Sequence, residues 1–279
     1  MSTKEISENA IIAQEYKNLL RNTYLSLSPA DIKLIRLAFE TAVDAHKEQR
    51  RKSGEPYILH PIAVAQIVAD QIGLGATSIA AALLHDVVED TSLTLEDIEL
   101  MFGKSVAKIV DGLTKISKLS KDKRVSVQAE NFKKMLLTMN DDVRVILIKI
   151  GDRLHNMMTL EFMPEEKQVR IASETLYIYA PLAHRIGMYN IKTQLEDLAL
   201  KYTEPDVYDA IEQKIKESEE EQLDYINSFS EQLQNHLAKE RVKFITEGRF
   251  KSIFSIRRKM QLKNKRFDEV FDRFAVRII

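Results

Sequence analysis

The sequence predicts a mainly α-helical protein, and three observations lead to that expectation. Only 8 Gly and 6 Pro occur among 279 residues, which is too few turn-forming residues for a fold built from many short strands. Apolar residues recur at intervals of three and four along most of the chain, as on one face of a helix. With 44% hydrophobic residues the chain can bury a sizeable core, in one large domain or two smaller ones.

Composition and charge exclude several classes of protein. The 41 Lys and Arg residues nearly balance the 42 Asp and Glu residues, which disfavours a globally basic nucleic-acid binder and an acidic disordered chain. The absence of Cys removes disulfides, thiolate metal sites and cysteine nucleophiles. No stretch reaches the ~18 uncharged apolar residues of a membrane span, and Met1 to Leu20 is too polar for a signal peptide. We therefore expect a cytoplasmic protein without a membrane partner.

Capping residues mark the helix starts. Ser28 followed by Pro29 is typical of an N-cap with Pro in the first helical position. Thr94 with Asp97 forms a capping box for a short helix that ends near Gly103. Further helices are expected at about 104–117, 127–139, 142–160 and 165–185.

Two more helices are expected between these caps. His60 opens one that runs to about Ile72, and Thr77 caps another that extends from Ile79 to Asp90. The second of these is apolar on every side, which is typical of a helix buried in a helical core, and it is too short to cross a membrane.

The character of the chain changes at about Glu204. Residues 205–240 form a polar helix rich in Glu and Lys, which we interpret as a solvated connector. Residues 239–279 contain 13 Lys and Arg against 5 Asp and Glu, and Phe274 to Ile279 has the composition of a strand. Because that strand has no evident partner, it suggests the beginning of an α/β domain that continues beyond this chain.

The adjacent pair His85 and Asp86 lies in the predicted buried helix. Burying a carboxylate without a partner costs several kcal/mol, so either a divalent cation or local hydrogen bonds must compensate Asp86. Glu89 and Asp90 follow four residues later, and a regular helix would place His85 and Glu89 on one face. So many carboxylates repel each other unless a cation or a proton offsets them.

A second polar group follows the apolar run of residues 145–150. Asp152, Asn156 and Thr159 fall on a single face of the predicted helix, and His60 opens another helix after a basic loop. Two imidazoles and two carboxylates without a thiolate suit manganese, iron, zinc or magnesium. A metal with open positions could supply a nucleophilic water near neutral pH.

These residues carry a resemblance to a known family. His60, His85-Asp86 and Asp152 are similar to the H…HD…D pattern of the HD metal-dependent phosphohydrolases. Longer strings resemble the hydrolase domain of RelA/SpoT homologues, which make and destroy the alarmone (p)ppGpp: RKSGEPYILHP at 51–61, ALLHDVVEDT at 82–91 and GDRLHNM at 151–157. The resemblance continues through ETLYIYAPLAHR at 174–185 and GRFKSIFS at 248–255, so it covers nearly all of the chain from about Leu27.

The resemblance implies a hydrolase domain at residues 1–200, an HD-type helical bundle, followed by a helical connector at 201–240 and a partial α/β synthetase domain at 241–279. The implied reaction is hydrolysis of the 3′-pyrophosphate of (p)ppGpp to GDP or GTP and pyrophosphate in the stringent response. It also implies roles for individual residues: His60, His85, Asp86 and Asp152 as ligands of one Mn²⁺; Glu89 and Asp90 as the pair that orients or activates water; Arg51, Lys52 and Ser53 as the loop that meets the guanine nucleotide; Asn156 and Thr159 as the lining of the ribose and 3′ side.

The resemblance extends to the synthetase domain of the same family. Arg249, Lys251 and Lys259 match a cradle for the ATP phosphates, and Asp272 matches a carboxylate that binds Mg²⁺. The second metal carboxylate would lie beyond Ile279, so we expect no pyrophosphate transfer by this chain, and Mg²⁺ only in a complete domain. A ribosome or tRNA partner would require regions outside this chain.

Several interpretations remain open from the sequence. The site could hydrolyse another nucleotide, such as a dNTP or NADPH, or belong to a non-catalytic regulatory module, although none of the expected site residues is missing. His155 could replace one of the metal ligands, and His46 could lie near the pocket. His184 and His236 are interpreted as structural or solvated.

Overall fold

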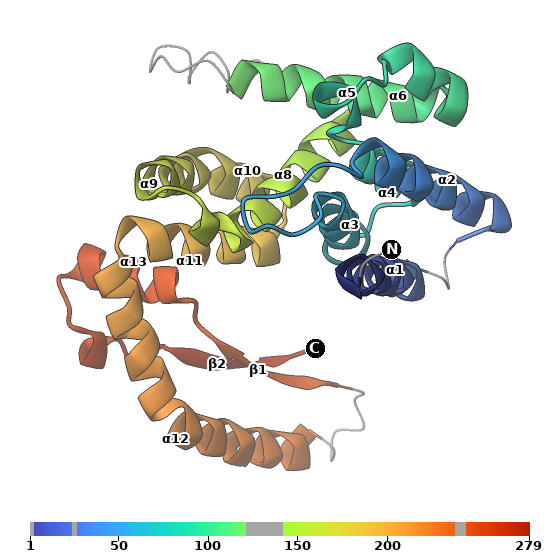
Figure 1. The fold of residues 1–279 in the computed structure, drawn as a ribbon. Coiled ribbons are helices and arrows are strands. Elements are labelled where there is room, and N and C mark those ends of the chain that lie inside the picture. Colours follow the sequence, from blue (N-terminus) through green and yellow to red (C-terminus); the bar gives the residue numbers. More distant parts are fainter. Residues whose placement is uncertain (1–2, 24–26, 121–141, 238–243) are drawn as a thin grey trace. The chain divides into compact units, whose positions relative to one another are not determined.

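The computed structural model describes residues 3–23, 27–120, 142–237 and 244–279 (Figure 1). The described residues are mainly helical, as predicted, with one two-stranded sheet. They divide into two compact units, the first made of Met1–Gln168 with Pro181–Ile191 and the second of Val169–Ala180 with Lys192–Ile279. The helix expected at 127–139 lies outside the described residues. No helix of the described part has both the length and the apolar character that a membrane crossing requires.

The first unit is built from helices. They are α1 (Thr3–Thr23), α2 (Pro29–Ala45), α3 (Leu59–Gln66) continued by the short π-helix Ile67–Gln71, α4 (Ala76–Leu83), α5 (Val87–Asp90), α6 (Leu95–Ser120) and α8 (Val143–Met158). Helices α9 (Glu165–Glu174) and α10 (Ala180–Arg185) follow and cross the division between the units. The Ser28 cap and the Thr94–Asp97 capping box are both present.

Helix α4 occupies the centre of this unit. It contacts α2, α3, α6 and α8, and its residues Ala80 to Leu83 are fully buried. This confirms the prediction of a helix without a solvent face. The expected cap was wrong, because Gly75 rather than Thr77 occupies the N-cap position of α4.

The predicted helix Ile79–Asp90 is interrupted, which corrects the sequence interpretation. Helix α4 ends at Leu83, and a tight turn over Leu84, His85 and Asp86 separates it from α5. The amide of Val87 donates to the carbonyl of Leu84 at 3.1 Å within this turn. His85 and Glu89 therefore do not occupy successive turns of one regular helix.

Helices α6 and α8 pack closely at Gly112. A Cβ atom at this position would lie 2.7 Å from a methyl carbon of Val145, so the glycine permits the approach of the two helices. Helix α6 bends at Gly103, where φ is 80°, in agreement with the expected helix end there.

The second unit combines most of α11 (Tyr189–Thr203), from Lys192 onward, with the helices α12 (Pro205–Leu237) and α13 (Ile253–Lys263). It also contains the strands β1 (Thr246–Phe250) and β2 (Phe274–Ile278). Its small core is formed by Ile211, Ile256 and Phe267. The strands pair antiparallel with Gly248 opposite Val276. The C-terminal strand was predicted correctly, but the expectation that it lacks a partner was wrong, because β1 pairs with it.

Candidate metal centre

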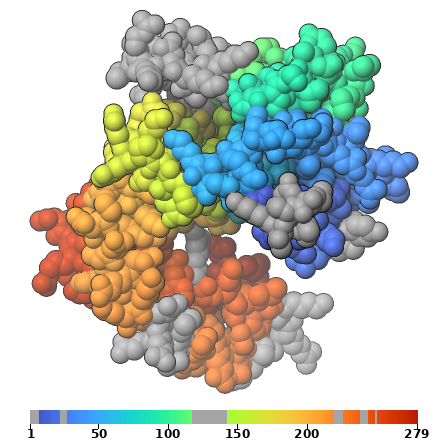
Figure 2. All heavy atoms as spheres, in the orientation of Figure 1, coloured from blue at the N-terminus to red at the C-terminus, as the bar shows by residue number. Residues whose placement is uncertain are grey.

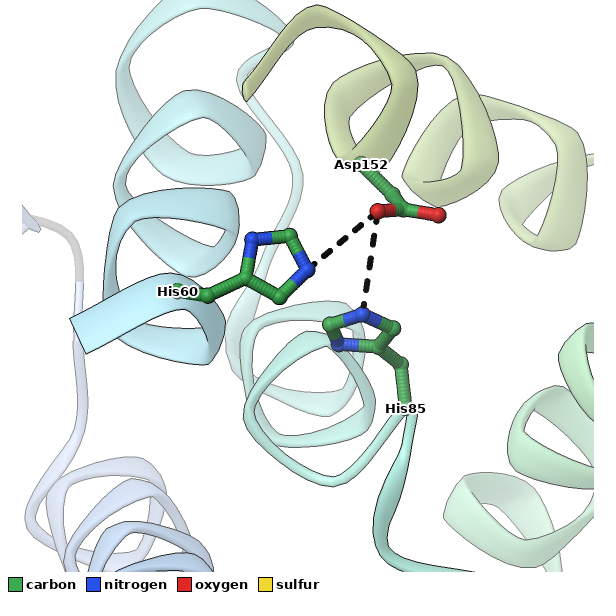
Figure 3. Close-up of side chains that lie close together, drawn as sticks. All are labelled: His60, His85 and Asp152. Atoms are coloured by element: carbon green, nitrogen blue, oxygen red, sulfur yellow. Dashed lines mark ion pairs between the residues drawn. The ribbon is translucent and has the colours of Figure 1, made fainter. Parts of the chain in front are cut away.

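Two helices and one turn of the first unit bring the predicted ligands together. His60 lies in the first turn of α3, His85 and Asp86 lie in the turn after α4, and Asp152 lies within α8. His60, His85 and Asp152 are at most 5% exposed. Figure 3 shows the two imidazoles pointing toward the Asp152 carboxylate from different elements.

The ligand atoms of these side chains converge on one point. Each of His60, His85 and Asp152 offers an atom within 4.8 Å of the others. Asp152 Oδ1 lies 3.3 Å from His60 Nε2 and 3.9 Å from His85 Nε2. Asp86 Oδ2 is 3.0 Å from His85 Nε2 and 3.8 Å from His60 Nε2. The structure thus brings together all four residues predicted to hold the metal.

The turn after α4 explains how neighbouring residues reach the same point. Consecutive side chains of a regular α-helix point about 100° apart. In the turn the backbone of Asp86 has φ −101° and ψ −7°, and its carboxylate approaches the imidazole of His85. The break in the helix therefore contributes two side chains to the centre instead of one.

The orientation of His85 fits a cation. Its Nδ1 lies 2.7 Å from the carbonyl oxygen of Ala82, and because a carbonyl only accepts, Nδ1 carries the proton. In the neutral ring, Nε2 therefore presents a lone pair toward Asp86 Oδ2 at 3.0 Å and Asp152 Oδ1 at 3.9 Å, and these carboxylate oxygens can only accept. A lone pair facing two carboxylates requires positive charge between them, and a divalent ion bound by nitrogen and oxygen supplies it.

The electrostatics of the centre lead to the same conclusion. Burial lowers the pKa of His85, but the carboxylates of Asp86 and Asp152 outweigh it and raise this pKa to about 9. Burial opposes ionisation of Asp152, yet Lys149 and the two imidazoles hold its pKa well below the usual range. Without an ion, a proton on His85 would serve as the positive charge.

Two further residues hold the carboxylates, and the sequence analysis missed both. Tyr57 donates from its hydroxyl to Asp86 Oδ2 at 2.6 Å and lies 3.5 Å from Asp90 Oδ2. Lys149 donates to Asp152 Oδ2 at 2.7 Å. Lys149 could have been identified from the sequence, because it is a lysine inside the apolar run of residues 145–150, one helical turn before Asp152. Tyr57 gives no comparable signal, because it lies in a loop, where sequence spacing does not predict the direction of a side chain.

The residues expected to orient water lie beside this centre. Asp90 is the exposed last residue of α5, and its backbone carbonyl accepts from Gln49 Nε2 at 2.7 Å. Glu89, also in α5, is half-buried. The Tyr57 hydroxyl lies between Asp90 and Asp86, a predicted ligand.

Several residues expected to bind the nucleotide also lie close together. Arg51 donates to Asn156 Oδ1 at 3.3 Å and to Thr159 Oγ1 at 3.0 Å, while Asn156 Nδ2 donates to Asp152 Oδ1 at 2.6 Å. The loop between α2 and α3 that carries Arg51 lies at the surface beside the chain that follows α8 (Figure 2). Lys52 in this loop is exposed and Ser53 is half-buried.

Of the remaining histidines, His155 contacts a predicted ligand, and the others make contacts of their own or are exposed. His46 is 1% exposed, and its Nδ1 lies 2.7 Å from Gln49 Oε1. The Nδ1 atoms of His155 and His60 are 2.8 Å apart. Burial and the neighbouring His60 and Arg51 lower the pKa of His155 to about 3. His184 packs against Tyr189, and His236 is exposed on α12.

In the second unit, the structure brings together three of the four residues matched to a synthetase. Asp272 Oδ2 accepts from Lys251 Nζ at 2.6 Å and from Lys259 Nζ, and these two bonds lower the pKa of Asp272. Arg249 lies in β1 opposite Ala275.

Comparison with known proteins identifies the class. The family model of the HD domain matches residues 38–189, more than half of the chain. The chain therefore belongs to the HD domain family, as its buried cluster of His60, His85 and Asp152 indicates.

The relatives narrow this class. The chain is 45% identical over 266 residues to the bifunctional (p)ppGpp synthase/hydrolase SpoT of Escherichia coli strain K12, covering 95% of this chain and 37% of the relative. It is 43% identical over 268 residues to the guanosine-3′,5′-bis(diphosphate) 3′-pyrophosphohydrolase of Vibrio cholerae, covering 96% of this chain and 36% of the relative. A GTP pyrophosphokinase of Myxococcus xanthus is 45% identical over 252 residues, with 89% of this chain and 33% of the relative covered.

Similarity to these RelA/SpoT homologues thus extends along nearly the whole chain, which confirms the resemblance drawn from the hydrolase motifs. The partial synthetase domain stays a prediction. The chain spans about a third of the length of these relatives. A solved structure of a metazoan orthologue of SpoT that hydrolyses ppGpp is 28% identical, with a TM-score of 0.49, and covers 62% of this chain and 96% of that chain.

Proposed function

We propose that this chain is a Mn²⁺-dependent hydrolase that removes the 3′-pyrophosphate of (p)ppGpp in the cytoplasm, as part of the stringent response. The observation that carries the proposal is the convergence of two imidazoles and two carboxylates from three buried elements. The names of the relatives from Escherichia coli and Vibrio cholerae support the choice of substrate.

His60, His85, Asp86 and Asp152 would hold the metal. When bound, Mn²⁺ supplies a Lewis acid that polarises a phosphoryl oxygen and acidifies water. Lys149 holds the outer oxygen of Asp152, whereas Tyr57 donates to the oxygen of Asp86 that faces His85. These two hydrogen bonds fix the direction in which the carboxylates face the centre.

Two carboxylates of the chain would accept the proton of the attacking water. Water attacks the phosphorus attached to the 3′ oxygen, the bond between them breaks, and the 3′ oxygen takes up a proton as pyrophosphate leaves. Glu89 and Asp90 orient the attacking water and accept its proton. The hydrogen bond from Tyr57 holds Asp86, and its hydroxyl lies near Asp90, so the ligand and the acid keep a fixed separation.

The loop residues would bind the nucleotide. Arg51 can stack on the guanine and Lys52 can neutralise phosphate charge, with Ser53 offering a hydroxyl beside them. Asn156 can both donate to and accept from a ribose hydroxyl, with Thr159 next to it. Arg51 already bonds to both of these side chains, so the proposed base and ribose contacts belong to one connected group.

We assign the hydrolase to residues 1–200, the connector to 201–240 and the beginning of a synthetase domain to 241–279. In this last segment Arg249, Lys251 and Lys259 supply positive charge for ATP phosphates, and Asp272 is the expected Mg²⁺ ligand. Because Lys251 and Lys259 both bind Asp272, a Mg²⁺ ion would have to displace them. We expect no pyrophosphate transfer from this chain.

The test compares three substrates. The purified chain is incubated in parallel with ppGpp, dGTP and NADPH, in Mn²⁺ or in chelator, and the products are separated by anion-exchange chromatography. We expect release of GDP and pyrophosphate from ppGpp alone, and only with Mn²⁺. Conversion of dGTP to a nucleoside and triphosphate, or turnover of NADPH, would identify another HD phosphohydrolase. Absence of all turnover would leave a non-catalytic module.

A further inference from the structure

His155 makes an unusual contact with one of the proposed metal ligands. It lies on α8, three residues after Asp152, and its Nδ1 is 2.8 Å from Nδ1 of His60. The two ring centroids are 4.9 Å apart. The contact therefore joins α8 to α3 behind the proposed centre.

A nitrogen–nitrogen contact this short requires a single proton between the two rings. A neutral imidazole has one protonated nitrogen, which donates, and one bare nitrogen, which accepts. His60 directs its Nε2 toward Asp152 Oδ1 at 3.3 Å. For that Nε2 to present a lone pair to a cation, the proton of His60 must be on Nδ1, and Nδ1 of His155 must accept it.

The second imidazole of the centre shows the same arrangement with a different acceptor. Nδ1 of His85 is held by the carbonyl oxygen of Ala82 at 2.7 Å. Metal-binding histidines usually donate their outer N–H to a carbonyl or carboxylate, which sets both the tautomer and the ring orientation. For His60, the acceptor beside Nδ1 is the imidazole of His155 instead of a carbonyl or a carboxylate.

We infer that His155 is a positioning residue whose bare Nδ1 holds His60 in the tautomer and orientation that bind the metal. This inference rests on the proposed metal centre but not on the identity of the substrate. His155 is thereby assigned as the support of a ligand, rather than as the alternative ligand that the sequence left open.

Direct metal binding tests this role. Mn²⁺ is titrated calorimetrically into the wild-type chain, His155→Ala and His155→Asn. Alanine removes the acceptor, whereas the side-chain oxygen of asparagine falls near the position of Nδ1 and accepts without carrying a proton. His184→Ala is the matched control, since His184 is an exposed histidine of the same unit that packs on Tyr189.

We expect His155→Ala to weaken Mn²⁺ binding by about 10- to 100-fold, His155→Asn to restore it to within a few-fold, and His184→Ala to match the wild type. Circular dichroism checks that each variant is folded. Wild-type affinity in His155→Ala would overturn the inference, as would an asparagine variant as weak as alanine.

A second measurement detects the proton itself. Nitrogen-15 NMR of the histidines with Zn²⁺, which is diamagnetic, should show a protonated Nδ1 in His60, and this signal should change in His155→Ala. An Nε2-protonated His60 in the wild type would overturn the inference. If the binding pattern appears but ppGpp is not hydrolysed, the proposed function fails alone; if ppGpp is hydrolysed and His155→Ala binds Mn²⁺ normally, only the role of His155 fails.

Discussion

At the residue scale, the centre depends on polar groups that are buried with carefully placed partners. His85 uses one nitrogen for the carbonyl of Ala82 and keeps the other for the centre. Asp152 is held by Lys149 and Asn156. Because unpaired buried charges are costly, removing one member of such a cluster affects all of the others.

Replacement of Asp86 should separate metal binding from folding. We expect Asp86→Ala to retain less than about a hundredth of the wild-type Mn²⁺ affinity and to lose ppGpp hydrolysis, since an oxygen that touches the metal contributes at least as much as the groups that support it. Metal content after dialysis, measured by plasma mass spectrometry, checks this. Asp209→Ala, at an exposed position of α12, is the control. Full activity in Asp86→Ala would remove Asp86 from the ligand set.

Replacement of Glu89 should have a different signature. If Glu89 orients water, Glu89→Ala should lower kcat by about 100-fold or more while the metal remains bound. Steady-state kinetics and metal analysis on the same sample distinguish the two effects. Loss of the metal in this variant would instead make Glu89 a ligand.

At the scale of elements, close contacts and helix ends decide where the site residues lie. Helix α8 carries Asp152, Asn156 and His155, and its approach to α6 depends on Gly112. In the second unit, the amide of Phe254 near the start of α13 donates to Asp197 Oδ1 at 2.8 Å. The contact of α6 with α8 is limited by steric fit, whereas the contact of α13 with Asp197 depends on charge. The first is tested by a change of side-chain size and the second by a change of pH.

The junction of α6 and α8 should not tolerate a methyl group. We expect Gly112→Ala to lower the free energy of unfolding by about 1–3 kcal/mol, because Val145 is rigid and fully packed. Thermal denaturation of the single variants and of the double variant with Val145→Ala measures the coupling. The double variant should be more stable than the sum of the two single effects predicts; simple additivity would contradict the close contact.

The junction at α13 should depend on pH. Burial raises the pKa of Asp197 to about 6, although the hydrogen bond from the Phe254 amide acts in the opposite direction. The folded state then binds more protons than the unfolded state between pH 4 and pH 6, so stability falls as the pH rises through this range.

Asp197→Asn keeps an acceptor for the Phe254 amide but cannot ionise. We expect it to remove about 1–2 kcal/mol of this pH-dependent loss, as measured by hydrogen exchange of the α13 amides at several pH values. Equal slopes in the variant and the wild type would show that Asp197 is not the group responsible.

At the scale of the whole molecule, the proposed metal connects elements that are distant in the sequence. Its ligands come from α3, from the turn after α4 and from α8. An ion that binds only the folded state shifts the unfolding equilibrium by mass action. Binding of the ion should therefore increase the free energy of unfolding of the first unit.

Mn²⁺ at 100 times its dissociation constant should stabilise the first unit by about 2.7 kcal/mol, which corresponds to a Tm increase of about 5–10 °C. Differential scanning calorimetry with Mn²⁺ and with chelator measures the shift, and hydrogen exchange should slow in α3 and α8. The shift should vanish in Asp86→Ala. An equal shift in that variant would mean that the ion acts elsewhere.

Much of this protein follows from local sequence. The caps at Ser28 and Thr94, the bend at Gly103 and the burial of α4 are consequences of short-range chemistry and of hydrophobic periodicity. His85, Asp86 and Asp152 were candidates because polar groups next to buried apolar runs require compensation, and the resemblance to the HD phosphohydrolases implied the full set with His60. The caps, the bend and the burial of α4 each depend on residues within a few turns of one another.

Contacts between distant segments decided the rest. The pairing of β1 with β2, the hydroxyl of Tyr57 on Asp86 and the imidazole of His155 behind His60 join residues that no local pattern connects. The turn that breaks the predicted helix at His85 likewise became clear only in the fold. The sequence determines which groups must be neutralised when they are buried, whereas only the packing of helices determines which groups neutralise them, because backbone periodicity carries no information about distances across the core.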